Sequence, residues 1–247
     1  MEEQQRNNKI NEVTTFPVPF ALEKIKDDIS INTNTTSYEK LINQAFEQHS
    51  RGNIIEAKRK YQLLIEKGVN DLRVYSNYSM ILKDLKCFDK AEKYIRKALE
   101  INPNSAMCNF NLGLILESVN KLDQSEKYTR KSIELNNSFA DGYLHLGKIL
   151  KLKGKLIESE ISIKKAIKIK PNHLSAHFNM GNLLKLLGRL EDAELSIRKA
   201  IQLNPSFAEA HYQLGNIFRD LGKSDKAILS IKKAISLDPY SYKYHYN

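Results

Sequence analysis

Apolar residues in this chain recur at the spacing of amphipathic helices, and the helical stretches alternate with turns. Apolar residues at Leu146, Ile149 and Leu150 share one face of a helix. Gly154 then indicates a turn, because glycine adopts the left-handed backbone conformation at little cost. A second helical stretch, of the type AILSIKKAISL, ends before a proline, which cannot continue a helix. The pattern predicts pairs of helices and no sheet.

These helix pairs repeat at an interval of 34 residues, as an overlay of the segments from Ala176 and Ala210 shows. The interval predicts six units without insertions: 38–71, 72–105, 106–139, 140–173, 174–207 and 208–241. Small residues recur where paired helices would approach closely, in the column Ala57, Ala91, Ser125, Ser159, Ala193 and Ala227. A larger side chain there would push the helices apart, so we interpret this column as structural.

A helix–turn–helix unit of this length, with these small-residue, aromatic and proline positions, resembles the tetratricopeptide repeat (TPR). The resemblance covers residues 38–241, although Val69 and Asn137 replace the proline and Ser132 replaces an alanine. It implies an all-α fold, a right-handed α-α superhelix (TPR solenoid) with two antiparallel helices per repeat. It also implies that the first helices line a concave groove, which binds a peptide or protein segment.

One column of the first helices is rich in amides and is a candidate peptide-binding site: Asn43, Asn77, Asn111, His145, Asn179 and Gln213. An amide side chain offers both a donor and an acceptor, so a file of amides could hold a peptide backbone of any sequence. The column is similar to the asparagine ladder in the superhelical arm of O-linked N-acetylglucosamine transferases. The alternative is that asparagine is simply common at this position of TPR units.

Two neighbouring columns complete the candidate groove. Apolar residues beside the amides are candidate pockets for side chains of the ligand: Ile42, Phe110, Leu144, Phe178 and Tyr212. Further along the same helices lies a mostly basic column, interrupted by Glu117: His49, Lys83, Lys151, Lys185 and Arg219. The basic column predicts a ligand that is partly acidic. The lysine–asparagine pair of a carboxylate clamp is missing, because Phe178 and Tyr212 stand where the lysines would be.

The formal net charge of +10 raises the possibility of a nucleic-acid or anionic-membrane partner. We favour a lysine-rich solvated surface instead. In the unit 140–173, four lysines fall in the second-helix stretch ISIKKAIKIK, which is expected to face outward. RNA binding is therefore the least favoured function. The leading hypothesis is a protein-interaction scaffold, and the second is the substrate-recruiting arm of a larger transferase.

Catalytic and metal chemistry is not indicated. The histidines are spaced by the repeat or lack acidic and cysteine partners at ligand spacing, and we expect no metal and no cofactor. The stretch LGKS lacks the glycine of a phosphate-binding loop, with Ile217 at that position. We find no nucleophile with a base and predict that the chain is not an enzyme. Two unpaired cysteines, Cys87 and Cys108, and no signal peptide or membrane-length apolar run predict a cytoplasmic location.

Both ends depart from the repeat. In residues 1–37, the apolar residues Leu22, Ile25 and Ile29 predict either a frayed tail or a short helix that caps the first unit. Residues 242–247, YKYHYN, copy the start of a seventh unit. We expect them to leave the last helix uncovered along Ile228, Ile231 and Ile235, which indicates a shortened chain or self-association through this end.

Overall fold

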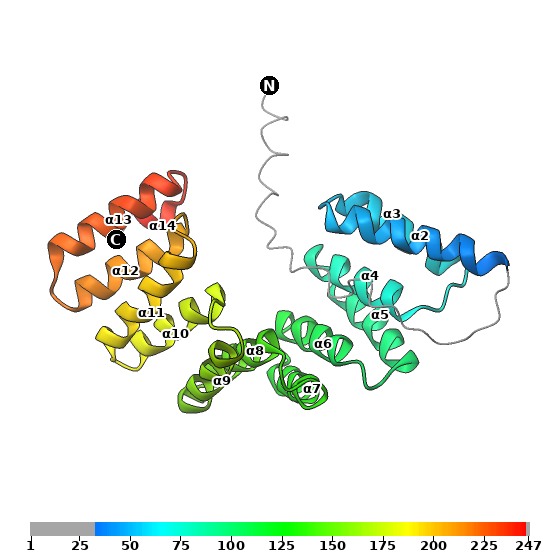
Figure 1. Cartoon of the computed structure of the whole chain (residues 1–247), viewed down its shortest axis with the longest axis horizontal. Coiled ribbons are helices and arrows are strands. Elements are labelled where there is room, and N and C mark those ends of the chain that lie inside the picture. Colours follow the sequence, from blue (N-terminus) through cyan, green and yellow to red (C-terminus); the bar gives the residue numbers. More distant parts are fainter. Residues whose placement is uncertain (1–32, 246–247) are drawn as a thin grey trace, which may run out of the picture. The chain divides into compact units, whose positions relative to one another are not determined.

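The structure is a computed structural model that describes residues 33–245, and every regular element in that range is a helix (Figure 1). The prediction of an all-α fold is thereby confirmed for the described residues. The first six helices are α2 (Thr33–Ser50), α3 (Ile54–Glu66), α4 (Leu72–Asp84), α5 (Phe88–Ile101), α6 (Ala106–Ser118) and α7 (Leu122–Leu135). The others are α8 (Ala140–Leu152), α9 (Leu156–Ile169), α10 (Leu174–Leu186), α11 (Leu190–Leu203), α12 (Ala208–Asp220), α13 (Ser224–Leu237) and α14 (Tyr242–His245).

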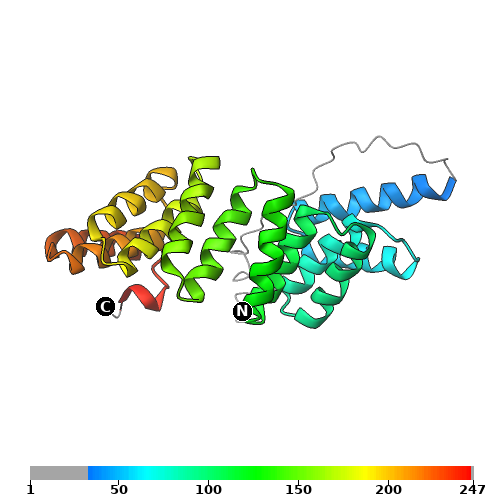
Figure 2. The same ribbon diagram turned by 90° about the horizontal axis from the view of Figure 1, so that it is seen from below.

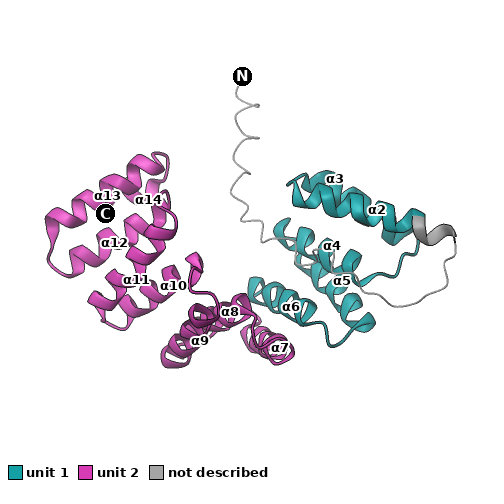
Figure 3. Ribbon diagram, viewed as in Figure 1, with its two compact units in different colours: residues 1–119 teal, residues 120–247 magenta. Residues whose placement is uncertain are grey.

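The helices form two compact units, which are divided between α6 and α7 (Figure 3). In unit 1, which ends at residue 119, α2 packs on α3 and α4 on α5, and α3–α4 and α5–α6 contacts join them. In unit 2, from residue 120, the pairs are α8–α9, α10–α11 and α12–α13. Contacts of α7 with α8, α9 with α10 and α11 with α12 connect these pairs (Figure 2). Within each unit, each helix therefore packs on its neighbours in the chain.

The turn after each first helix contains one residue with positive φ. Glycine holds this conformation at Gly52, Gly154, Gly188 and Gly222. The two remaining turns use Lys86 and Asn120, with φ of 59° and 58°. Non-glycine residues in this region carry a steric penalty of about 1 kcal/mol or more, so these two turns are less favourable than the glycine ones. The predicted role of the turn glycines is confirmed.

Glycines inside the first helices allow a close approach of the paired second helix. A Cβ added to Gly181 would lie 2.5 Å from Cγ1 of Ile197, and one added to Gly147 would lie 2.5 Å from Cγ1 of Ile163. Ser159 also donates a hydrogen bond of 2.7 Å to the carbonyl of Gly147. The predicted small-residue column is buried along its whole length: Ala57, Ala91, Ser125, Ser159, Ala193 and Ala227.

The chain ends of the described region differ from expectation. Helix α2 begins at Thr33, ahead of the predicted unit start at residue 38. The predicted cap around Leu22, Ile25 and Ile29 lies outside the described residues. None of the helices between Thr33 and His245 is long and apolar enough to span a bilayer.

The expectation of an uncovered last helix is wrong in part. Tyr244 on α14 is buried, and its ring centroid lies 5.0 Å from that of Tyr212 on α12. Ile231 and Ile235 pack against the cluster that these two rings form with Ala234. The physical reason is that α14 is held against α12 by an ion pair of 2.7 Å between Lys243, next to Tyr244, and Glu209. In the predicted bare flank, Ile228 alone stays largely exposed, at 52%.

Candidate functional site

Two members of the predicted amide column are buried and hydrogen-bonded within unit 1. Asn77 on α4 donates from Nδ2 to the hydroxyl of Tyr61 on α3 over 3.2 Å. Asn111 on α6 donates from Nδ2 to Oγ of Ser76 on α4 over 3.0 Å. Each asparagine is only 2% exposed. The expectation that these amides are exposed to a ligand is wrong, because they face helices of the preceding repeat and connect the repeats to each other.

His145 occupies the same column on α8 in unit 2 and is also buried. Its Nδ1 lies 3.0 Å from Oγ1 of Thr129 on α7, the helix that precedes α8. The contact again runs from a first helix to the repeat before it. The column therefore contributes to the packing between repeats in both units, whatever else it does.

The other three members of the column are accessible. Asn43 is exposed and lines an open hollow of about 700 Å³ on α2. Asn179 and Gln213 are half-buried, on α10 and α12. Asn179 donates 2.7 Å to the carbonyl of Ser175, and Gln213 donates 2.9 Å to Oε1 of Glu209. Both bonds lie within one helix at its surface, where a ligand amide could replace them.

The predicted apolar pockets are filled by the protein itself. Phe110 and Tyr212 are 6% and 4% exposed, and Ile42 and Leu144 are buried as well. Phe178 is half-buried, and its ring centroid lies 4.8 Å from that of Phe207. These residues belong to the packing between helices, and the prediction that they form open pockets is wrong.

The basic column divides into paired and unpaired members. Lys83 forms an ion pair of 2.8 Å with the neighbouring Asp84, and Lys185 one of 3.2 Å with Asp220. Lys151 on α8 and Arg219 on α12 have no carboxylate partner among the residues that the structure describes. The two unpaired cations, together with Lys185, lie on three first helices of unit 2.

A residue that the sequence analysis missed adds to this set. Lys148 lies one helical turn before Lys151 on the half-buried side of α8. It forms no ion pair with a carboxylate within residues 33–245, although its charge helps to lower the pKa of Asp141 on the same helix. Burial lowers the pKa of Lys151, and the adjacent ammonium of Lys148 lowers it further. The spacing of three residues could have signalled this pair, because such residues share a helix face.

The equivalent positions on the next helices are polar. Asn182 on α10 is half-buried, and Asn216 on α12 is buried with an Oδ1 that finds no partner in the described chain. We call the accessible set the basic strip, and it consists of Lys148, Lys151, Asn182, Lys185 and Arg219. The strip presents four cationic side chains and one amide side chain to a ligand.

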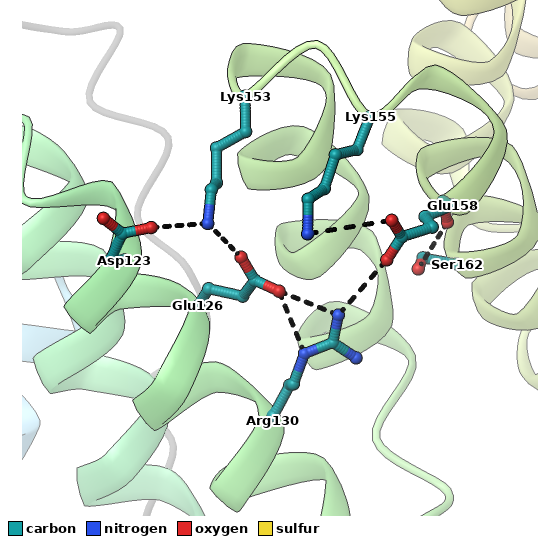
Figure 4. A network of polar contacts seen from close by, with 7 residues as sticks. All are labelled: Asp123, Glu126, Arg130, Lys153, Lys155, Glu158 and Ser162. Atoms are coloured by element: carbon teal, nitrogen blue, oxygen red, sulfur yellow. Dashed lines mark hydrogen bonds and ion pairs between the residues drawn. The ribbon is translucent and has the colours of Figure 1, made fainter.

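A different arrangement, in which the charges neutralise one another, lies on the second helices α7 and α9 and on the turn between α8 and α9 (Figure 4). Lys153 contacts Glu126 at 2.6 Å and Asp123 at 2.5 Å. Arg130 contacts Glu126 at 2.8 Å and Glu158 at 3.6 Å. Burial alone would raise the pKa of Glu126, but hydrogen bonds from Lys153 and Arg130 outweigh it and lower the pKa. These cations form ion pairs with neighbouring acids, whereas Lys148 and Lys151 form none within the described residues.

The histidines have local structural contacts. His173 lies 3.0 Å from Asp141, an acidic partner that the sequence analysis failed to find. His177 and His211 each contact a proline carbonyl through Nε2. His49, predicted to belong to the basic column, stacks edge-on against Tyr61, and burial lowers its pKa. It is therefore a neutral ring near pH 7 rather than a cation. Across residues 33–245, no cluster of three His, Cys, Asp or Glu side chains could hold a metal ion.

Comparison with known proteins agrees with this architecture. Family models described as tetratricopeptide repeat match residues 72–105, 94–127, 140–173, 175–207 and 208–241, which together make up more than half of the chain. The chain belongs to the tetratricopeptide repeat family. A search of curated protein sequences found no significant match.

Solved structures share the fold at low sequence identity. PilW, described as a widely conserved type IV pilus biogenesis factor, matches with a TM-score of 0.77 and 21% identity, over 85% of this chain and 97% of PilW. Pseudomonas aeruginosa PilF matches with a TM-score of 0.74 and 16% identity, over 87% and 97%. YrrB, described as a TPR protein with an unusual peptide-binding site, matches with a TM-score of 0.57 and 20% identity, over 75% and 95%. These identities support a common TPR solenoid fold and nothing more specific.

Proposed function

We propose that this chain is a protein-interaction scaffold, which binds an extended, partly acidic peptide segment across the first helices α8, α10 and α12 of unit 2. The observation that carries the proposal is the pair Lys148 and Lys151. Two half-buried lysines lie one turn apart, and neither forms an ion pair with a carboxylate within the described residues. Asp141, the carboxylate whose pKa Lys148 helps to lower, is paired with His173. Family membership supports the general function, because TPR solenoids present such surfaces to protein segments.

An acidic side chain of a ligand would relieve an unfavourable arrangement. Partial burial disfavours the charged form of Lys151, and the ammonium of Lys148 repels it. A carboxylate placed between the two ammoniums would form charge-assisted hydrogen bonds with both. Arg219 adds a cation without an ion pair on α12, and Lys185 adds one on α10 that is paired with Asp220, so a segment with several spaced acidic residues fits better than a single carboxylate.

The backbone of the ligand would use the accessible amides. Asn182 is half-buried on α10, and Asn179 and Gln213 have side-chain hydrogen bonds only within their own helices. Amides of this kind can pair with both groups of a peptide bond. Asn77, Asn111 and His145 have a structural part in this proposal and do not contact the ligand. YrrB, with its unusual peptide-binding site, is a precedent for such a ligand on this fold.

The test uses the full chain and peptides selected from a random library of about twelve residues, long enough to extend over roughly 40 Å. We expect the selected peptides to be enriched in Asp and Glu. Binding of a labelled selected peptide, measured by fluorescence anisotropy, should weaken at least tenfold in the variant Lys148→Glu/Lys151→Glu. It should also weaken with added salt, because partly exposed charges are screened.

A matched control is the variant Lys90→Glu/Lys93→Glu. These two lysines are exposed on the second helix α5, with the same spacing and the same change of net charge. Peptide affinity should change less than about twofold in this control, as expected for charges remote from the ligand. Equal losses in both variants would show non-specific attraction and refute the site. Tight binding of single-stranded RNA without any selected peptide would favour the RNA hypothesis instead.

A further inference from the structure

The outer faces of three second helices in unit 2 carry exposed aliphatic residues at one repeated position. Ile161 on α9, Leu195 on α11 and Leu229 on α13 are 63%, 67% and 68% exposed. We call these three residues the outer row. The equivalent position in each of the three preceding repeats holds a basic residue: Arg59, Lys93 and Lys127. A large aliphatic side chain in water is unfavourable, and here three occur at consecutive equivalent positions.

Ion pairs link the helices that carry the row. Arg189, at the start of α11, contacts Glu160 on α9 at 2.8 Å. Lys223, at the start of α13, contacts Glu194 on α11 at 3.7 Å. Each of these glutamates directly precedes a residue of the outer row in the sequence. The start of each of these second helices therefore lies next to the preceding second helix.

The charges on either side of the row have opposite signs. On α13, Asp225 lies one turn before Leu229, and Lys232 lies one turn after it. Both are exposed, and neither has an ion-pair partner among residues 33–245. On α11, Glu191 and Arg198 flank Leu195 in the same order, and Arg198 is already paired with Glu194 on its own helix at 2.8 Å, so Lys232 is the cation of this edge that is left for a partner. One edge of the row is thus acidic on two of its three helices, and the other edge is basic.

The opposite charges at the two edges of the row distinguish between possible partners for this face. An anionic membrane or a uniformly acidic helix would be attracted by Lys232 and repelled by Asp225 and Glu191. A second copy of the same face matches both edges if the two-fold axis runs along the row. The second helices are then antiparallel across the interface, which places each acidic edge against the basic edge of the other copy.

We propose that the outer row is a self-association face, through which two copies of the chain form an antiparallel dimer. Leu195 and Leu229 each pack against their own counterparts, and Asp225 pairs with the counterpart of Lys232. The aliphatic side chains, with Ile157 one turn before Ile161, would bury on the order of 1,000 Å² in the two copies together, at the low end of specific interfaces. The dimer is therefore weak and reversible. It is independent of the proposed peptide site, which lies on the first helices.

Sedimentation velocity of the full chain over a wide concentration range tests this proposal. We expect a monomer–dimer equilibrium in the wild type. The variant Leu195→Lys should raise the dimer dissociation constant at least tenfold. The matched control is Ile55→Lys on α3, which changes an exposed aliphatic residue, 88% exposed, outside the row. This control should leave the equilibrium unchanged.

A charge exchange supplies a second readout that does not depend on the apolar residues. Lys232→Glu should weaken the dimer, because it places a glutamate against the counterpart of Asp225. Adding Asp225→Lys to the same chain should restore the wild-type constant. A strict monomer at every concentration, an equal effect of Ile55→Lys, or failure of the rescue in a folded double variant would each overturn the proposal. Binding of the monomer to phosphatidylserine vesicles that is lost in Leu195→Lys would identify a membrane as the occupant and overturn it as well.

Discussion

Replacing Asn77 by alanine should lower the free energy of unfolding by about 1 to 3 kcal/mol, which is the usual effect of removing one partner from a buried hydrogen bond. The substitution removes the Nδ2 donor that contacts the hydroxyl of Tyr61 over 3.2 Å. Tyr61 is fully buried and Asn77 is 2% exposed, so water does not readily replace the lost donor. The smaller side chain also leaves a void between α3 and α4, which adds to the loss.

The expected change is large enough for an ordinary denaturation experiment. For a domain of this kind, a loss of about 2 kcal/mol corresponds to a shift of about 1 M in the urea midpoint, since the slope is about 2 kcal/mol per molar urea. Far-UV circular dichroism would follow the unfolding. Tyr61→Phe and the double variant complete a cycle, which should give a coupling energy of about 0.5 kcal/mol or more between the two side chains.

Asn43→Ala is the natural control, because Asn43 belongs to the same sequence column but is exposed on α2. Its effect should stay within about 0.5 kcal/mol, as for most surface substitutions. If Asn77→Ala were as mild as Asn43→Ala, or if the cycle showed no coupling, the structural role assigned to the buried amides would be wrong.

Three further predictions concern single residues. Lys86→Gly should raise the unfolding free energy by about 0.5 to 1 kcal/mol in thermal melts, because Lys86 holds a φ of 59° at which glycine is unstrained; a loss of stability would contradict this. Gly181→Ala should destabilise by about 1 to 3 kcal/mol in urea, because its methyl group would lie 2.5 Å from Ile197, and an unchanged midpoint would contradict it. Asp141→Asn should flatten the acid dependence of stability: the hydrogen bond from His173 lowers the pKa of Asp141, so this stabilisation is present above about pH 4 and is lost as the pH falls through the folded-state pKa. Urea midpoints at about pH 3 and pH 6 measure that difference, and an unchanged slope in the variant would refute it.

Local patterns were sufficient to predict the helix pairs. The turn glycines are required by the backbone conformation, and the small residues at Ala193 and its equivalents are required by the close approach of paired helices. Both requirements are visible in the sequence as small residues. Lys86 and Asn120 are exceptions, because the same turn conformation occurs there without glycine. Their turns keep the glycine conformation because the flanking helices determine it, although Lys86 does not favour it and Asn120 merely tolerates it better than most residues.

The surroundings of the amide column could not be predicted from the sequence. An asparagine on a first helix can turn toward a ligand or toward the preceding repeat, and the amide chemistry is the same in both cases. Asn111 meets Ser76 and His173 meets Asp141 across about one repeat length, so neither contact leaves a short-range signal. The apolar residues beside the column were misjudged for the same reason, since Tyr212 is covered by Tyr244 from α14.

Several expectations from the sequence stay predictions. They include the six repeat boundaries, the likeness to the transferase arm, the cytoplasmic location and the lack of enzymatic activity. The acidic character of the ligand also stays a prediction, which in our proposal depends on Lys148 and Lys151 and not on His49, whose pKa burial lowers.

The most direct test of the central claim is to locate a bound acidic peptide on the protein by amide chemical-shift mapping. A selected peptide is titrated into the isotope-labelled full chain, and the shifted resonances are assigned to helices. The account predicts that the largest shifts fall on α8, α10 and α12, around Lys148, Lys151 and Arg219, and that Lys148→Glu/Lys151→Glu removes them. Shifts confined to the second helices α9, α11 and α13, or shifts that persist in this variant, would contradict it.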